Sequence, residues 1–77
     1  MRVRLTDPAA AVDLSEFLRA RIGAVVEQTS PRRPGGETLI EVSLLGSYGE
    51  EALRSEIEAA VRRWAISRRR PAPVIEP

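Results

Sequence analysis

The clearest hydrophobic pattern in the chain runs from Ser47 to Arg70. Apolar residues recur there every three or four positions, which places them in one stripe along an α-helix; they are Leu53, Ile57, Ala60, Val61 and Trp64. The first residues are typical of a capping box, in which Ser47 accepts a hydrogen bond from a free backbone N–H and Glu50 reaches back to the cap residue. Pro71 disfavours helical geometry in the residue before it, so the helix is predicted to end at or before Arg70.

Charged residues along this segment support the same helix. Two pairs, Glu50–Arg54 and Glu58–Arg62, place a glutamate four residues before an arginine, an orientation that contributes roughly a few tenths of a kcal/mol to helix stability. A helix with a single apolar stripe needs a surface to pack against. The rest of the chain is expected to supply it.

A short strand and another helix come earlier in the chain. Arg2–Leu5 alternates polar and apolar residues and predicts a strand. Asp7 followed by Pro8 predicts a helix start with Asp7 as the N-cap, and Gly23 predicts its end, because glycine adopts the left-handed conformation without steric cost. The residues predicted to share one side of this helix are Ala10, Leu14, Phe17, Leu18 and Arg21.

The middle of the chain is predicted to form a β-hairpin. Residues 24–29 contain two valines and a threonine, and residues 38–45 alternate apolar with polar positions. The segment between them, residues 30–36, holds two prolines and two glycines and is typical of a loop. An alternative interpretation extends the first helix through Gln28. Residues 72–76 predict a last short strand, which the prolines beside it would confine to a sheet edge.

The predicted order of elements is therefore βαββαβ, in a single α+β domain over residues 1–77 with residues 71–77 as an edge strand or a tail. This order is that of the ferredoxin-like sandwich, in which two helices cover one face of a four-stranded antiparallel sheet whose first and third strands are central. The alternative is a βαβαβ chain with a three-stranded sheet, which requires the longer first helix.

Two stretches of the sequence resemble a group of small uncharacterised bacterial proteins with a ferredoxin-like domain. They are residues 2–8 (Arg-Val-Arg-Leu-Thr-Asp-Pro) and residues 13–19 (Asp-Leu-Ser-Glu-Phe-Leu-Arg). The resemblance extends over most of the chain. It implies the same fold and no particular function.

The composition excludes several kinds of chemistry. The 77 residues include no cysteine and no histidine, which rules out disulfides, thiolate chemistry, Cys/His zinc sites and imidazole catalysis. The glycines lack the spacing and the lysine of a phosphate loop. We therefore expect no enzyme activity, no cofactor and no metal. No apolar run approaches the roughly 20 residues that cross a membrane, so a cytoplasmic location is expected.

The candidate binding surface is the sheet face that the helices would leave open. Strand alternation places Arg2, Arg4, Leu39, Glu41 and Ser43 on that face. Residues 25 and 27 would extend it from the second strand. The leucine gives an apolar spot among charges, which favours a contact surface. The alternative is a solvated face whose arginines and glutamates form cross-strand pairs worth well under ~1 kcal/mol each.

Two arginine clusters are candidates for contacts with anions or nucleic acid, namely Arg32 with Arg33 and Arg68 with Arg69 and Arg70. Each arginine on a phosphate would add salt-dependent affinity that is blind to sequence. The alternative roles are solubility in a loop and complementation of a helix dipole, which a net charge of only +1 favours. Recognition of RNA by a sheet needs aromatic residues on the central strands, and residues 39–45 contain none.

These observations predict a small non-enzymatic module that binds a protein partner or a second copy of itself through the open sheet face or an edge strand. The edge near Arg2–Leu5 is expected to be poorly covered by the short last strand, and exposed edges recruit partners. The alternatives are an ACT-like sensor domain for a small metabolite and weak nucleic-acid binding through the arginine clusters. Nucleic acid is the less favoured of these partners, and no membrane association is expected.

Overall fold

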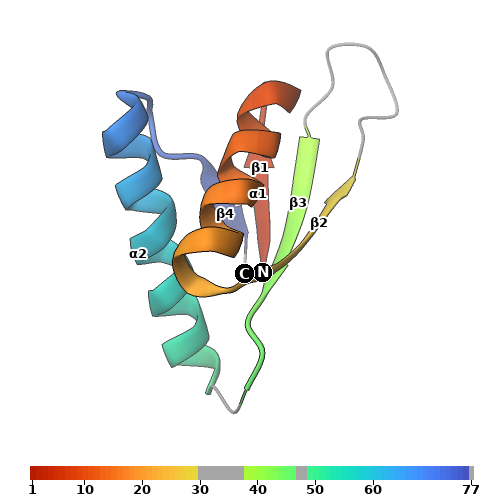
Figure 1. Cartoon of the computed structure of the whole chain (residues 1–77), viewed down its shortest axis with the longest axis vertical. Helices are drawn as coiled ribbons and strands as arrows, with labels where there is room; N and C mark the ends of the chain where they lie inside the picture. The colour runs from red at the N-terminus through yellow and green to blue at the C-terminus, as the bar shows by residue number, and fades with distance from the viewer. Residues whose placement is uncertain (30–37, 47–48, 77) are drawn as a thin grey trace.

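The computed structural model describes residues 1–29, 38–46 and 49–76, and it contains four strands and two helices (Figure 1). The elements in chain order are β1 (Arg2–Leu5), α1 (Pro8–Ile22), β2 (Val25–Thr29), β3 (Thr38–Ser43), α2 (Glu50–Arg68) and β4 (Val74–Glu76). This is the predicted α+β class and the predicted order of elements.

The four strands form one sheet in the order β2-β3-β1-β4, and every neighbouring pair is antiparallel. The first and third strands are therefore central, and both helices lie over the same side of the sheet (Figure 1). Because residues 25–29 form β2, the alternative with a longer first helix and a three-stranded sheet is wrong. Residues 74–76 pair with β1 and are an edge strand rather than a tail.

Helix α1 begins and ends where the sequence predicts. The Asp7 carboxylate accepts a hydrogen bond from the backbone N–H of Ala9, and Pro8 occupies the first turn. Gly23 has a left-handed backbone with φ of 63°, and its N–H donates to the carbonyl of Arg19. This left-handed turn stops the helix and releases the chain into β2.

Helix α2 begins later than its pattern predicts. Its N-cap is Gly49, whose position offers no side-chain cap, and its first helical residue is Glu50. Glu50 therefore stands at the first position rather than the third, so the predicted capping box is wrong; Ser47 itself lies outside the described residues. Arg54 pairs with Glu58, four residues later, and not with Glu50 as expected.

The end of α2 is set by an arginine in a left-handed conformation. Arg69 has φ of 54°, and the N–H of Arg70 donates to the carbonyl of Ala65. Pro71 explains this turn, because the residue before a proline avoids helical geometry. The helix therefore ends at residue 69, where an arginine rather than a glycine adopts the left-handed conformation.

The core lies between the helices and one face of the sheet. Its fully buried members include Val3, Ile40 and Val42 from the strands and Leu14, Ile57 and Trp64 from the helices. Trp64 is 1% exposed, which confirms its predicted place in the core.

The buried side of α1 is rotated from the predicted one. Ala11 and Ser15 are buried, whereas Phe17 is only half-buried and Arg21 is exposed. Ser15 tolerates burial because its hydroxyl donates to the carbonyl of Ala11 over 2.7 Å. Within the described residues, neither helix is both long and apolar enough to cross a membrane.

Candidate interaction surface

The sheet has one face without helices, which we call the open face. Its side chains alternate with the buried ones along each strand, and they are Arg2, Arg4, Val25, Glu27, Thr29, Leu39, Glu41, Ser43, Val74 and Glu76. All five residues that the sequence placed there, Arg2, Arg4, Leu39, Glu41 and Ser43, therefore lie on one surface. The predicted additions from β2 lie beside them.

The strand register aligns the charged residues of the open face in one row. Glu27 lies opposite Glu41, Glu41 opposite Arg2, and Arg2 opposite Glu76. Arg2 Nε is 3.3 Å from Glu41 Oε2, and Arg4 forms an ion pair with Glu76. Both arginine side chains are at least two-fifths exposed, so each pair contributes less than about 1 kcal/mol.

Glu27 is the residue of this row whose charge is not balanced. It faces Glu41 across the β2–β3 ladder, and like charges at directly opposite positions repel each other. In the described part of the chain Glu27 forms no ion pair, whereas Glu41 has Arg2 on its other side. A cation from outside would relieve this repulsion.

Apolar side chains accompany these charges. Leu39 is half-buried between Arg4 and Thr29, while Val25 and Val74 are 42% and 61% exposed at the two edges of the sheet. The open face therefore combines exposed apolar groups with one carboxylate, that of Glu27, which has no ion-pair partner among the described residues.

The edge of β1 is better covered than expected. β4 pairs with Arg2, Val3 and Arg4, so the prediction of a poorly covered edge along Arg2–Leu5 is wrong for these three positions. The physical reason is that Val74–Glu76 extends directly alongside β1 despite the prolines that precede it.

The outer edge of β2 is also partly occupied. The backbone N–H and carbonyl of Val42 both bond to Met1 on the β1 side, so the Val26–Val42 pair is not hydrogen-bonded and the polar groups of Val26 point away from the sheet. There Arg19 Nη2 donates to the carbonyl of Val26 over 2.9 Å. A partner strand would have to displace this arginine. The open face is the more accessible surface.

The arginine cluster at the end of α2 is divided among different contacts. Arg68 Nε and Nη2 lie 2.8 and 3.2 Å from the two carboxylate oxygens of Asp13, which also accepts a hydrogen bond from Trp64 Nε1 at 2.9 Å. The hydrogen bond from Arg68 and, next, that from Trp64 lower the pKa of Asp13 below its ordinary value of 3.8. Arg69 ends the helix. Arg68 and Trp64 of α2 are thus both tied to Asp13 of α1.

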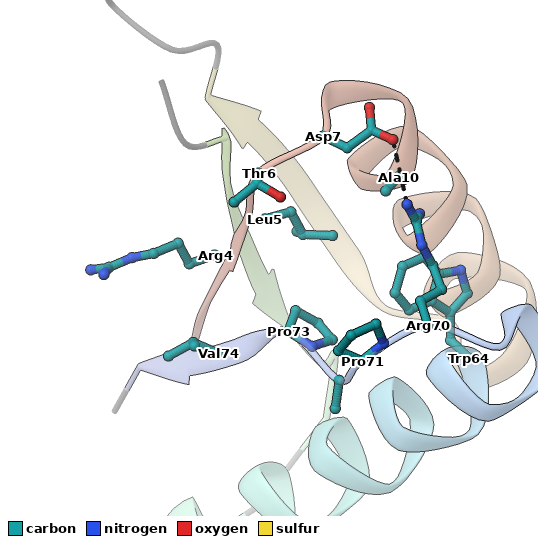
Figure 2. Close-up of a pocket in the computed structure, with 11 residues that line it drawn as sticks. Arg4, Leu5, Thr6, Asp7, Ala10, Trp64, Arg70, Pro71, Pro73 and Val74 are labelled. Carbon is teal, nitrogen blue, oxygen red and sulfur yellow. Dashed lines mark hydrogen bonds and ion pairs between the residues drawn. The ribbon is translucent and has the colours of Figure 1, made fainter. Parts of the chain in front are cut away.

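Arg70 closes the other side of the same tryptophan. Its guanidinium lies 5.7 Å from the centroid of the Trp64 ring and 3.5 Å from Asp7 Oδ2 (Figure 2). These residues line a groove between the end of β1, the start of α1 and the segment that leads into β4 (Figure 2). The opposite charges of Asp7 and Arg70 reduce the net charge of this groove.

Sequence reasoning missed these contacts because their partners are far apart in the chain. Asp13 and Arg68 are separated by 55 residues, and Asp7 and Arg70 by 63. The arginine run was visible, but only the fold brings acidic residues of α1 to it. Arg32 and Arg33, the other predicted cluster, lie outside the described residues.

Comparisons of this chain with protein-family models, with curated proteins and with solved structures found no match. Across the described residues, no group of three or more acidic side chains is placed to hold a metal ion. Among the described residues, the open face and the outer surfaces of the helices are therefore the candidate binding surfaces.

Proposed function

We propose that this chain is a ferredoxin-like domain that acts as a small non-enzymatic interaction module, and that it binds a protein partner through the open face. The strand order β2-β3-β1-β4, with a helix after β1 and after β3, supports the fold assignment. The observation that carries the function is the opposition of Glu27 and Glu41 beside exposed Val25 and half-buried Leu39.

The partner's chemistry follows from this arrangement. A basic side chain placed between Glu27 and Glu41 would replace their repulsion by attraction, and apolar groups on either side of it would cover Val25 and Leu39. We propose a partner segment that presents lysine or arginine among apolar residues. Nucleic acid is a poorer candidate, because Arg68 and Arg70 are already engaged by Asp13 and Asp7.

The test compares three baits in extracts of the source organism: the wild type, Glu27→Arg and Glu16→Arg. Glu27→Arg creates an attractive pair with Glu41, so it removes the acidic site without threatening the fold. Glu16→Arg makes the same charge change at an exposed position of α1. Captured proteins are quantified with and without nuclease.

We expect a nuclease-resistant protein partner that Glu16→Arg retains and Glu27→Arg loses. A partner retained equally by all three baits would remove the open face from the proposal. A partner that disappears with nuclease would replace protein by nucleic acid as the ligand class. Recovery of the bait alone, at physiological salt, would refute the interaction module.

A further inference from the structure

Most of the outer side of α2 faces away from the rest of the domain (Figure 1), and near the end of the helix Arg63 and Ile66 border a shallow groove with Phe17 and Arg21 of α1. Its side chains are exposed at helical spacing along the whole length, and they are Ala52, Ser55, Ala59, Arg62 and Ile66. Ile66 is 71% exposed, among the most exposed of the large hydrophobic residues. A large apolar side chain such as that of Ile66, exposed among small and polar residues, requires an explanation.

The charges of α2 are divided between its two halves. The first half holds four glutamates and one arginine, Arg54, which pairs with Glu58; the second half holds Arg62, Arg63 and Arg68. The helix dipole explains charges only in the terminal turns, because its effect falls off within the first and last turn. Glu56, Arg62 and Arg63 lie in interior turns, so the helix dipole does not explain their positions.

These interior charges have no partner inside the domain. In residues 1–29, 38–46 and 49–76, neither Glu56, Arg62 nor Arg63 forms an ion pair or a side-chain hydrogen bond. Arg68 and Arg70, by contrast, both reach acidic residues of α1. The middle of α2 therefore carries unpaired charges of both signs, separated along the helix.

We propose that two copies of this chain associate through the outer sides of their α2 helices, packed antiparallel about a two-fold axis near Ala59. Antiparallel packing places the acidic half of each helix beside the basic half of the other, and the two-fold axis repeats every contact. Residues at nearly equal distances from Ala59, and on the same flank of the contact, then lie beside each other. Ile66 packs over Ala52 of the second copy, and Glu56 lies beside Arg63 of the second copy.

The helix geometry permits this contact at Ala59. Packed helices lie about 8–10 Å apart, and Cα atoms stand about 2.3 Å from each axis, which leaves roughly 3.5–5.5 Å between the facing Cα atoms. An exposed alanine can occupy that space, whereas a long side chain at the axis would not. The outer side of α2 therefore presents only a small side chain at the point where the two helices would approach most closely.

The charge pattern favours a second copy over other occupants. A phosphate backbone or an anionic membrane would be attracted to Arg62 and Arg63 but repelled by Glu51 and Glu56 on the same helix. The helix itself supplies both complementary halves. This inference goes beyond the proposed function, because α2 lies on the far side of the domain from the open face, and the dimer would display two open faces to partners.

The first test is sedimentation equilibrium over a wide range of protein concentration at low and high salt. We expect the wild type to reach twice the 8.5 kDa mass of the chain, with association that weakens at high salt. Arg63→Glu should weaken association at least about tenfold, because two like-charge contacts replace two attractive ones. Glu56→Arg combined with Arg63→Glu should restore it. Arg19→Glu, the same change at an exposed position of α1 outside the groove that Arg63 and Ile66 border, should leave it unaltered.

A monomer at every concentration would overturn the proposal, as would a double variant that associates no better than Arg63→Glu alone. Equal weakening by Arg19→Glu would assign the effect to net charge and also overturn the proposal. Circular dichroism on each variant separates loss of association from loss of folding. None of these substitutions lies on the open face, so partner binding is scored independently.

The second test uses the absence of cysteine from the chain. Ala59→Cys introduces a single thiol at the proposed two-fold axis, where the upper part of the expected range of Cα separations overlaps that of a disulfide, about 4.4–6.8 Å. Mild oxidation should convert most of this variant into a covalent dimer. Ala20→Cys, on the exposed side of α1, is the matched control and should cross-link only by slow random collision. Equal rates for the two variants would refute the antiparallel α2 contact.

Discussion

Trp64 joins the two helices to each other and to the sheet, so its removal tests the fold most directly. The indole ring is 1% exposed, its Nε1 donates to Asp13, and Arg70 lies over the ring. Replacement by alanine removes the largest buried side chain of the domain. We expect Trp64→Ala to lower the free energy of unfolding by about 3–5 kcal/mol.

That loss is large on the scale of the whole domain. A chain of 77 residues has a free energy of unfolding of roughly 4–12 kcal/mol, from about 0.05–0.15 kcal/mol per residue. Trp64→Ala should therefore remove a quarter or more of the stability and leave the weakest case unfolded. Urea titration followed by far-ultraviolet circular dichroism measures this loss, since the variant has no tryptophan fluorescence.

Two further variants divide the effect between volume and polar contacts. Trp64→Phe keeps an aromatic ring in the core and loses the hydrogen bond to Asp13 and only part of the buried volume, so it should cost clearly less than alanine. Val12→Ala, at a 47% exposed position of α1, should change stability by no more than about 0.5 kcal/mol. If Trp64→Ala costs no more than Val12→Ala, the indole is not a core residue and the packing described above is wrong.

Four other predictions concern single features of the structure. The Thr38 hydroxyl is buried without a hydrogen-bond partner in the described residues, so Thr38→Val should stabilise the domain by about 1 kcal/mol while Thr38→Ser destabilises it; a destabilised valine variant in urea titration would contradict this. Arg69→Gly should gain up to about 1 kcal/mol by relieving the left-handed backbone, and an unchanged urea midpoint would show that no strain is present there. Glu27→Arg should raise the melting temperature at low salt and less so at high salt. A lower melting temperature would show that Glu27 and Glu41 do not repel each other in the folded state. The hydrogen bonds from Arg68 and Trp64 lower the pKa of Asp13 in the folded state, so the ionised carboxylate stabilises the fold fully above pH 3.8, and this stabilisation is lost as the pH falls below that value. The free energy of unfolding of Asp13→Asn should therefore decrease less than that of the wild type between pH 7 and pH 3.

Local signals in the sequence were sufficient for most of the elements. Asp7 with Pro8, and Gly23, fix the ends of α1 through a side-chain cap and a left-handed residue, both of which are properties of a few neighbouring residues. Alternation along Arg2–Leu5 and Thr38–Ser43 gave the strands and the side of the sheet on which each residue lies. These features depend on contacts within a turn or between neighbouring positions.

The predictions that were wrong concern features that depend on residues distant in sequence. Ser15 is buried because its hydroxyl is satisfied within α1 and because the sheet lies on that side, which hydrophobicity alone does not reveal. α2 starts at Glu50 after a glycine cap, so the spacing of Ser47 and Glu50 did not predict its first turn. The open face followed from alternation, but its one unbalanced residue, Glu27, emerged only from the register of β2 against β3.

The arginines of α2 show why the same residue type has to be judged by its surroundings. Arg68 and Arg70 bond to acidic residues of α1 and close the structure around Trp64, so their charges are already used inside the domain. Arg62 and Arg63 point outward beside Glu56 and Glu58 of the same helix. An exposed pair of charges is worth little within one domain, but in an antiparallel pair of helices each of them occurs twice and selects the orientation of the partner. For this reason we assign folding to the last arginines of α2 and self-association to the middle ones, a division that Arg63→Glu and Arg68→Glu should separate: the first should alter the mass in solution, and the second the urea midpoint.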